Sequence, residues 1–391
     1  MRVEGDFIKI NEWLTPLSWI YGLGVRLRNW LFDVGMIRSR AFDIPVISVG
    51  NITVGGSGKT PHVEYLVRLL KDHAKVAVLS RGYKRKSHGY VLADNNTHME
   101  AIGDEPYQMH MKFPDIYVAV DKRRCEGIDR LQQDSQTSDV DVILLDDAFQ
   151  HRYVKPGINI LLIDYHRIII YDKLLPAGRL REPQSGKSRA DIVIITKCPK
   201  DLKPMEFRVL TKAMNLYPYQ ELFFTTLDYD TPHQLFGTQT IKLELLRNQH
   251  VLLLTGIASP KQMIVDLEKY APDITPMTFA DHHAFRVKDV EHINTTFERM
   301  SEPRLILTTE KDATRLMGLN GLSDEVRTHI FVLPIRVKFM QEQEETFNHN
   351  IISYVRKNSR NSILVKGKDD RKSNDGHHSG HRTRTISFRD N

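Results

Sequence analysis

A glycine-rich segment at residues 50–61, with the sequence GNITVGGSGKTP, carries the strongest chemical signal in the chain. Glycines let backbone N–H groups curl around phosphate oxygens, a lysine adds a mobile positive charge, and a threonine at a helix start can ligate Mg²⁺. A strict P-loop has glycine at position 53, where this chain has Thr53, and the alternative interpretation is a glycine-rich turn without a ligand. We predict a nucleotide-phosphate site formed by Gly55, Gly56, Ser57, Gly58, Lys59 and Thr60.

Two adjacent carboxylates, Asp146 at the end of the apolar run 140–146 and Asp147 directly after it, precede the string AFQHR. The carboxyl end of a buried strand in an α/β sheet faces the ligand crevice beside a P-loop, so both are candidate ligands of Mg²⁺. Neighbouring residues on an extended strand point in opposite directions, so both can act only if the backbone turns there. The alternative is that an aspartate here simply caps a helix.

Six shorter strings combine cations and carboxylates: SRGY at 80–83, GDEP at 103–106, Arg123-Arg124, PAGRLREP at 176–183, DHH at 281–283 and TEKD at 309–312. Phosphoryl transfer needs cations around the phosphates and a carboxylate that orients the attacking hydroxyl. Each string alone is also compatible with a turn or an exposed charge. His282 and His283 have no matching ligand cluster around them, which favours an acid–base or orienting role over metal binding.

Short apolar runs separated by helix-like stretches must position these residues. The runs lie at 44–50, 75–80, 116–120, 140–146, 158–164 and 191–196, and a second set lies at 251–256, 304–313 and 331–334. Strands that are apolar on both faces belong inside parallel sheets covered by helices, so we expect an α/β doubly wound, mostly parallel P-loop-type sheet and a second, smaller α/β lobe. The expected domains are 1–40, 41–220, 221–350 and 351–391, and the hinge lies near residues 215–235.

The segment from Trp13 to Val34 has a different pattern. On a helix its apolar residues gather on one side, and Ser18, Gly22, Asn29 and Asp33 lie opposite. Arg26 and Arg28 flank the apolar stripe, which suits a helix lying at the water–lipid boundary, although the segment is too interrupted to span a bilayer. The alternative is an amphipathic helix whose apolar face packs on the sheet or on a partner.

The amino-acid composition limits the kind of protein that this chain can be. The 391 residues are 41% hydrophobic and include only two cysteines, which suits a globular protein of a reducing compartment rather than a disulfide framework. Residues 356–391 hold ten Lys and Arg against four Asp and Glu, so they carry the whole net charge of +6, and we expect a basic disordered tail. With a neutral core, no nucleic-acid partner is expected, although a nucleic-acid-binding ATPase that uses the tail remains an alternative. Residues 1–11 predict no signal peptide.

Taken together and in this order, the strings GNITVGGSGKTP, SRGY, GDEP, DDAFQHR, LLPAGRLREP, DHHAF and TEKDA resemble those of the tetraacyldisaccharide 4′-kinases, the lipid A 4′-kinases of Gram-negative bacteria. The resemblance covers about residues 12–340. It implies an ATP- and Mg²⁺-dependent kinase that phosphorylates the 4′-hydroxyl of a tetraacylated glucosamine disaccharide 1-phosphate. It also implies a peripheral position at the cytoplasmic face of the inner membrane, and no obligate protein partner is expected.

The resemblance also implies roles for single residues. Asp104 would be the catalytic base and His282 its partner, Lys59, Thr60, Asp146 and Asp147 would handle ATP and Mg²⁺, and Tyr83, Arg124 and Arg181 would line the cleft. The choices between Arg123 and Arg124, Arg179 and Arg181, and His282 and His283 stay open. Ala148 stands where the family usually has glycine. A P-loop GTPase or metallochaperone-type switch is the alternative function, but Pro199 of the string TKCP replaces the aspartate that reads guanine.

Overall fold

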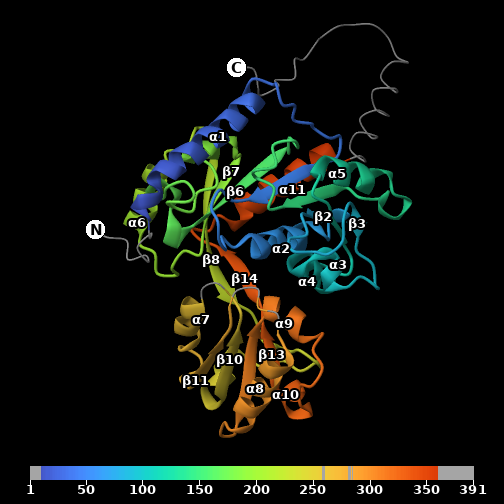
Figure 1. The fold of residues 1–391 in the computed structure, drawn as a ribbon, viewed down its shortest axis with the longest axis vertical. Helices are drawn as coiled ribbons and strands as arrows, with labels where there is room; N and C mark the ends of the chain where they lie inside the picture. Colours follow the sequence, from blue (N-terminus) through green and yellow to red (C-terminus); the bar gives the residue numbers. More distant parts are fainter. Residues whose placement is uncertain (1–9, 258–259, 281–282, 284, 360–391) are drawn as a thin grey trace.

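The computed structural model describes residues 10–257, 260–280, 283 and 285–359, and it contains two sheets in two lobes (Figure 1). The larger sheet has the strand order β14-β8-β7-β6-β1-β5-β2-β4-β3, and all neighbouring pairs from β8 to β4 are parallel. Its strands are β1 (Val46–Gly50), β2 (Val76–Ser80), β3 (Val91–Leu92), β4 (Tyr117–Val120), β5 (Val142–Asp146), β6 (Ile158–Asp164), β7 (Ile192–Thr196), β8 (Glu221–Tyr229) and β14 (Ile335–Phe339). The expected α/β, mostly parallel fold is confirmed.

Helices cover both faces of the large sheet. The apolar side chains of α2, α4 and α11 share one core with the face that includes Ile47 and Val49, while α5 and α6 bury the opposite face. These helices are α2 (Lys59–Leu70), α4 (Asp104–Lys112), α5 (Arg124–Gln133), α6 (Pro204–Met214) and α11 (Glu344–Asn358), and the short helix α3 (Met99–Ile102) precedes α4. The strand order changes direction around β1, so the loop after β1 lies at the switch point where α/β sheets bind ligands.

The smaller sheet has the order β11-β10-β12-β13-β9 and forms the lower lobe in Figure 1. Its elements are β9 (His233–Gln234), β10 (His250–Thr255), α7 (Pro260–Leu267), β11 (Ile274–Thr278), α8 (Val287–Glu298), β12 (Arg304–Thr309), α9 (Glu310–Leu316), α10 (Asp324–His329) and β13 (Ile330–Leu333). The antiparallel pair β8–β14 connects the lobes, in register from Ile335 opposite Tyr229 to Phe339 opposite Thr225.

The lobe limits differ from the expected boundaries at residues 220 and 350. Strand β8 and helix α11 both belong to the larger lobe, because Phe223 and Ile351 lie in the core that α2 shares. Of the expected disordered tail, residues 351–358 are therefore helical, and residues 360–391 lie outside the described residues. The run at 304–313 is also not one strand, since Thr309 ends β12 and its Oγ1 accepts a hydrogen bond from the Asp312 N–H to cap α9.

Helix α1 (Thr15–Asp33) lies along the outside of the larger lobe (Figure 1). It packs on the protein through small and polar residues and, near its end, through Phe32, which is buried against Tyr153. Ser18 Oγ donates to the Leu174 carbonyl at 2.9 Å, and at Gly22 a Cβ would lie 2.7 Å from the Leu174 side chain. Most of the other large apolar side chains of α1 and its flanks face outward. Trp19 is 73% exposed, Trp13, just before the helix, is 94% exposed, and Leu17, Ile20, Leu23, Leu27, Trp30 and Val34 are exposed as well. The expected helix is therefore present, but its apolar stripe does not pack on the sheet.

Candidate active site

The glycine-rich loop joins β1 to α2, as its sequence predicts. Gly55 and Gly58 have φ of +123° and +80°, a region of backbone space that favours glycine, so the loop can curl before the helix begins at Lys59. Inside the curl, Asn51 Nδ2 donates to Ser57 Oγ at 2.7 Å. This hydrogen bond therefore helps to hold the loop in its curled shape.

Strands β6 and β7 support this loop from behind. Thr196 Oγ1 donates to the Ser57 carbonyl at 2.9 Å, and Lys197 Nζ donates to the Gly56 carbonyl while it pairs with Asp164 at 2.7 Å. The TKCP string thus begins with two residues that hold the P-loop carbonyls. These hydrogen bonds engage the carbonyl oxygens of Gly56 and Ser57, and a glycine-rich loop at a helix start can offer its remaining N–H groups to phosphate.

His62 anchors the first turn of α2. Its Nδ1 donates to the Gly58 carbonyl at 2.7 Å, so its Nε2 accepts from Thr225 Oγ1 at 3.0 Å. Burial, opposed in part by the Gly58 hydrogen bond, lowers the pKa of His62 to about 4. The imidazole is therefore neutral at physiological pH, and this support of the P-loop does not change charge.

The two carboxylates at the end of β5 are brought together by a backbone turn. Asp147 has φ of +50°, whereas Ala148 is not in the left-handed region, so the alanine there causes no strain. Ser80 Oγ donates to Asp146 Oδ2 at 3.3 Å, and among the described residues Asp146 Oδ1 has no hydrogen-bond partner. Burial raises the pKa of Asp146 to about 6, and the charges of Asp147 and Glu105 act in the same direction. A cation here would relieve that penalty.

Lys59 and Arg181 both face Asp147. Lys59 Nζ lies 3.3 Å from Asp147 Oδ1, and Arg181 Nη1 lies 3.6 Å from Oδ2. Burial alone would raise the pKa of Asp147, but these two cations outweigh it and hold the pKa below its ordinary value. Asp147 is therefore ionised, and the P-loop lysine lies beside it.

Backbone pairing explains why Arg181 lies here. The Val54 N–H donates to the Arg179 carbonyl at 2.8 Å, and the Arg181 N–H donates to the Ile52 carbonyl at the same distance. The PAGRLREP string therefore runs beside the start of the P-loop. Arg179 is exposed and lies near Gly55, whereas the half-buried Arg181 reaches Asp147, so both candidates border the site in different places.

Arg124 and Arg123 lie in different environments. The Arg124 guanidinium is buried, donates to the Asp121 carbonyl, and donates to the Asp146 carbonyl at 3.1 Å. Burial lowers the pKa of Arg124 to about 10. Arg123 is exposed and pairs with Glu126 at 2.7 Å. Of the two arginines, Arg124 is therefore the one that binds the backbone of Asp146, the candidate Mg²⁺ ligand.

The SRGY and GDEP strings meet beside this strand end. A Cβ on Gly103 would lie 2.8 Å from the Tyr83 carbonyl, and a Cβ on Gly82 would lie 3.0 Å from the Ile102 carbonyl. Gly82 and Gly103 also have positive φ, so this close contact between two loops needs both glycines. Tyr83 is exposed beside the loop, and Asp104 begins α4 directly after Gly103.

Asp104 receives an arginine from the other lobe. Arg315 of α9 donates to Asp104 Oδ2 through Nε at 3.1 Å and through Nη2 at 2.5 Å. Its Nη1 pairs at 3.1 Å with buried Asp312, and Asp312 Oδ2 accepts from the Gly256 N–H at 2.8 Å. The TEKDA string thus orients an arginine toward the candidate base. Arg315 was missed from the sequence, where only the TEKDA residues before it gave a signal.

Lys112 forms a second contact between the two lobes, at the other end of α4 from Asp104. Lys112, the last residue of α4, pairs at 2.5 Å with buried Glu64 of α2 and also pairs with Glu310 of α9. Gln108 Nε2 donates to Glu64 Oε1 at 3.0 Å. The P-loop helix, the Asp104 helix and the smaller lobe therefore share one ion-pair network, of which the sequence indicated only Glu310.

The structure describes only one of the two candidate histidines, His282 and His283. His283 pairs with Asp289 at 2.9 Å and stacks on Phe279, so it is engaged within the smaller lobe. His282 lies outside the described residues. Within the described part of the chain, no three or more His, Cys, Asp or Glu side chains cluster as a metal site, which leaves Asp146 and Asp147 as a two-carboxylate candidate.

Several known proteins are similar to this chain along most of its length. The model of the family described as tetraacyldisaccharide-1-P 4′-kinase matches residues 10–356. A tetraacyldisaccharide 4′-kinase of Phocaeicola vulgatus is 59% identical over 92% of this chain and 99% of its own length, and one of Bacteroides thetaiotaomicron is 52% identical over 92% and 97%. A crystal structure of LpxK from Aquifex aeolicus in complex with ATP has a TM-score of 0.69 and 31% identity over 88% of this chain and 98% of that one.

Proposed function

The chain belongs to the tetraacyldisaccharide-1-P 4′-kinase family, and we propose that it transfers the γ-phosphoryl group of ATP to the 4′-hydroxyl of a tetraacylated glucosamine disaccharide 1-phosphate. The observation that carries this conclusion is the P-loop after β1 with Lys59 beside Asp147, within a chain that matches the family along nearly its whole length. Two observations disfavour the GTPase alternative. The relatives are named as kinases, and Pro199 occupies the position of the aspartate that recognises guanine in GTPases.

We propose that the N–H groups of the loop from Gly55 to Gly58 hold the ATP phosphates and that Lys59 moves from Asp147 toward them. Asp146, Asp147 and the Thr60 hydroxyl would hold Mg²⁺, which usually takes one or two carboxylates together with phosphates and water. The buried Asp146 Oδ1, which has no hydrogen-bond partner among the described residues, fits this assignment. When bound, Mg²⁺ neutralises charge on the phosphates. Arg124 would act as a positioning residue through the Asp146 backbone, and Arg181 and Tyr83 would border the cleft.

Asp104 would accept the proton of the attacking hydroxyl. It starts α4, next to the loop that carries Tyr83, and two N–H groups of Arg315 fix its carboxylate in one orientation. An oriented carboxylate within reach of the acceptor hydroxyl is what general-base catalysis requires. His282 would assist the proton transfer, as expected from the family resemblance.

The outward face of α1 supports a peripheral position on the inner membrane, at its cytoplasmic face. None of the helices among the described residues is both long and apolar enough to cross a bilayer. Each large apolar side chain that enters lipid contributes roughly 1.5–3 kcal/mol, against about 1 kcal/mol for an arginine near anionic lipid. Arg26 is exposed and can reach headgroups, whereas Arg28 donates to the Gln150 carbonyl at 2.9 Å. Apolar contact would therefore dominate the binding.

The decisive experiment follows labelled γ-phosphate from ATP to a tetraacylated disaccharide 1-phosphate in mixed micelles. Wild type should label the acceptor at the 4′ position. Asp104→Asn should lower kcat by about 10²–10⁴-fold, the usual contribution of a positioned base. Asp72→Asn, at an exposed position after α2, is the matched control and should stay close to wild type. Absence of labelled lipid with wild type would refute the proposed function.

A further inference from the structure

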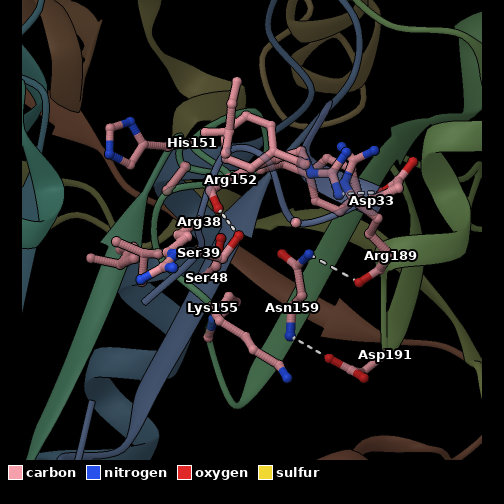
Figure 2. A pocket seen from close by; sticks show the side chains of 18 residues that line it. Asp33, Arg38, Ser39, Ser48, His151, Arg152, Lys155, Asn159, Arg189 and Asp191 are labelled. Atoms are coloured by element: carbon pink, nitrogen blue, oxygen red, sulfur yellow. Dashed lines mark hydrogen bonds and ion pairs between the residues drawn. The ribbon is translucent and has the colours of Figure 1, made fainter. Parts of the chain in front are cut away.

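A polar pocket of about 600 Å³ lies between the end of α1 and the large sheet (Figure 2). Its floor includes Ser48 of β1 and Asn159 of β6, and residues 32–39 and 151–156 form its sides. Ile47 and Val49 point into the core shared with α2, so Ser48 faces the opposite side of the sheet. The pocket is therefore on the α1 side of the sheet, away from Asp104 and α2.

Two buried polar atoms at the floor lack partners. Ser48 is 2% exposed and Asn159 is 9% exposed, and within the described part of the chain neither Ser48 Oγ nor Asn159 Oδ1 has a hydrogen-bond partner. The Asn159 amide is oriented by its Nδ2, which donates to the Arg189 carbonyl at 3.0 Å, so an acceptor oxygen faces the pocket. An unpaired buried polar group destabilises the folded protein, and a ligand of matching polarity would remove that penalty.

The sides of the pocket carry more positive than negative charge. Figure 2 shows Arg38, Arg152 and Arg189 around Ser48 and Asn159. Arg152 pairs with Asp33 at 2.5 Å, and Arg189 pairs with Glu182 at 2.7 Å. Arg38 and Lys155 are exposed and have no ion-pair partner among the described residues.

His151, which also lines the pocket, adds no charge. Burial, together with the nearby charges of Arg124, Arg28 and Arg81, lowers its pKa to about 4. The pocket therefore combines two cations without an ion-pair partner among the described residues, one hydroxyl donor and one amide acceptor. The Asp191 carboxylate also lines it and accepts from the Asn159 N–H at 2.8 Å (Figure 2). A bare anion would satisfy the cations and Ser48 but would leave Asn159 Oδ1 unpaired.

We propose that this pocket binds a phosphorylated sugar or polyol headgroup. The phosphate oxygens accept hydrogen bonds from Arg38, Lys155 and the Ser48 hydroxyl, and a hydroxyl of the sugar or polyol donates to Asn159 Oδ1. A phosphate with an adjacent hydroxyl is the simplest chemistry that satisfies all four groups.

The mouth of the pocket lies where the outward apolar surface of α1 ends. Val34 and Met36 are 50% and 71% exposed, and the intervening Gly35 lines the pocket together with Ile37. The headgroup therefore comes from a lipid at the membrane surface. Its source is either the reducing-end glucosamine 1-phosphate of the acceptor, which rests on the proposed function, or the glycerophosphate of a phospholipid.

The first test measures binding of glucosamine 1-phosphate and glycerol 1-phosphate to the full chain by isothermal titration calorimetry. Arg38→Ala/Lys155→Ala should weaken binding about fivefold for each lost cation, and Ser48→Ala should weaken it about tenfold. Lys71→Ala/Arg130→Ala, which removes two exposed cations elsewhere, should leave it unchanged. Ser48→Ala removes an unpaired hydroxyl, so its melting temperature should not fall. No binding by wild type, or equal binding by all variants, would overturn the proposal.

Two further arms separate the sources. If the acceptor is the ligand, the pocket variants raise the KM for the 1-phosphate acceptor but not for an analogue with a free 1-hydroxyl, in neutral detergent. If a phospholipid is the ligand, they lower affinity for vesicles of phosphatidylcholine with phosphatidylglycerol but not for phosphatidylcholine alone. The vesicle and calorimetric arms need no turnover. A wild type that binds the probes but transfers no phosphate would therefore refute the proposed function and leave the pocket in place.

Discussion

Removal of the Lys112 ammonium should destabilise the protein strongly. Lys112→Met keeps the apolar stem but leaves buried Glu64 and nearby Glu310 without their shared cation. Burial raises the pKa of Glu64, the charge of Glu310 raises it further, and Lys112 opposes both. Removing one partner of a buried ion pair costs about 3–5 kcal/mol. Gln108 and Arg68 still contact Glu64 at 3.0 and 3.4 Å, so we expect the lower end, about 3 kcal/mol.

The pH dependence identifies Glu64 as the origin of this loss. A carboxyl whose folded pKa is raised stabilises the folded state at low pH, and that contribution is lost as pH rises through the folded pKa. Without Lys112 the pKa of Glu64 rises further, so the loss measured by urea unfolding should be larger at about pH 8 than at about pH 5.5. Adding Glu64→Gln to Lys112→Met should recover part of the loss at the higher pH.

The matched control is Lys86→Met, because Lys86 and Glu100 form a pair at 2.7 Å in which both side chains are largely exposed. An exposed pair contributes about 0–1 kcal/mol, so this variant should unfold close to wild type. Equal losses in the two lysine variants, or a loss in Lys112→Met that does not change with pH, would refute the reasoning.

Three further outcomes are expected. Lys59→Ala should remove most turnover in the labelled-phosphate assay, and full activity would contradict the P-loop assignment. Because the pKa of Asp146 is raised to about 6, a proton competes with Mg²⁺ below that pH, and the Mg²⁺ concentration for half-maximal rate should rise about tenfold per pH unit there. In Asp146→Asn, a kinetic titration with Mg²⁺ should no longer show this pH dependence. An unchanged pH profile in the variant would exclude Asp146 as a Mg²⁺ ligand. Trp13→Asp/Leu27→Asp/Trp30→Asp should abolish flotation with liposomes, whereas complete release of wild type by salt alone would contradict apolar binding.

The parts of the site that the sequence predicts well are those fixed by local structure. The GGSGKT loop and the carboxylates after VILLD each lie within a few residues of the strand that positions them. The same locality explains why the α/β class and the central strands could be predicted. The edge strand β11 was missed because Pro276 interrupts it and its residues are mostly exposed.

Contacts between distant segments left no signal in the sequence. Arg315 and Asp104 are 211 positions apart, and nothing near either residue indicates that the two lobes bring them together. The orientation of α1 is a similar case. Its period predicts an apolar stripe, but a helix can bury either side. The contacts of Ser18, Gly22 and Phe32 with the larger lobe place the opposite side against the protein.

The inverted packing of α1 has a consequence for how the enzyme would sit on a bilayer. Many amphipathic helices fold only when they bind lipid, and the entropy lost on ordering the chain then reduces their binding affinity. Here Ser18 ties the helix to Leu174 and Asp33 ties it to Arg152, so the helix is already formed and its axis is fixed relative to the sheet. Lipid contact would then orient the whole larger lobe as a rigid body, so the P-loop would be held at a constant height and tilt above the membrane plane.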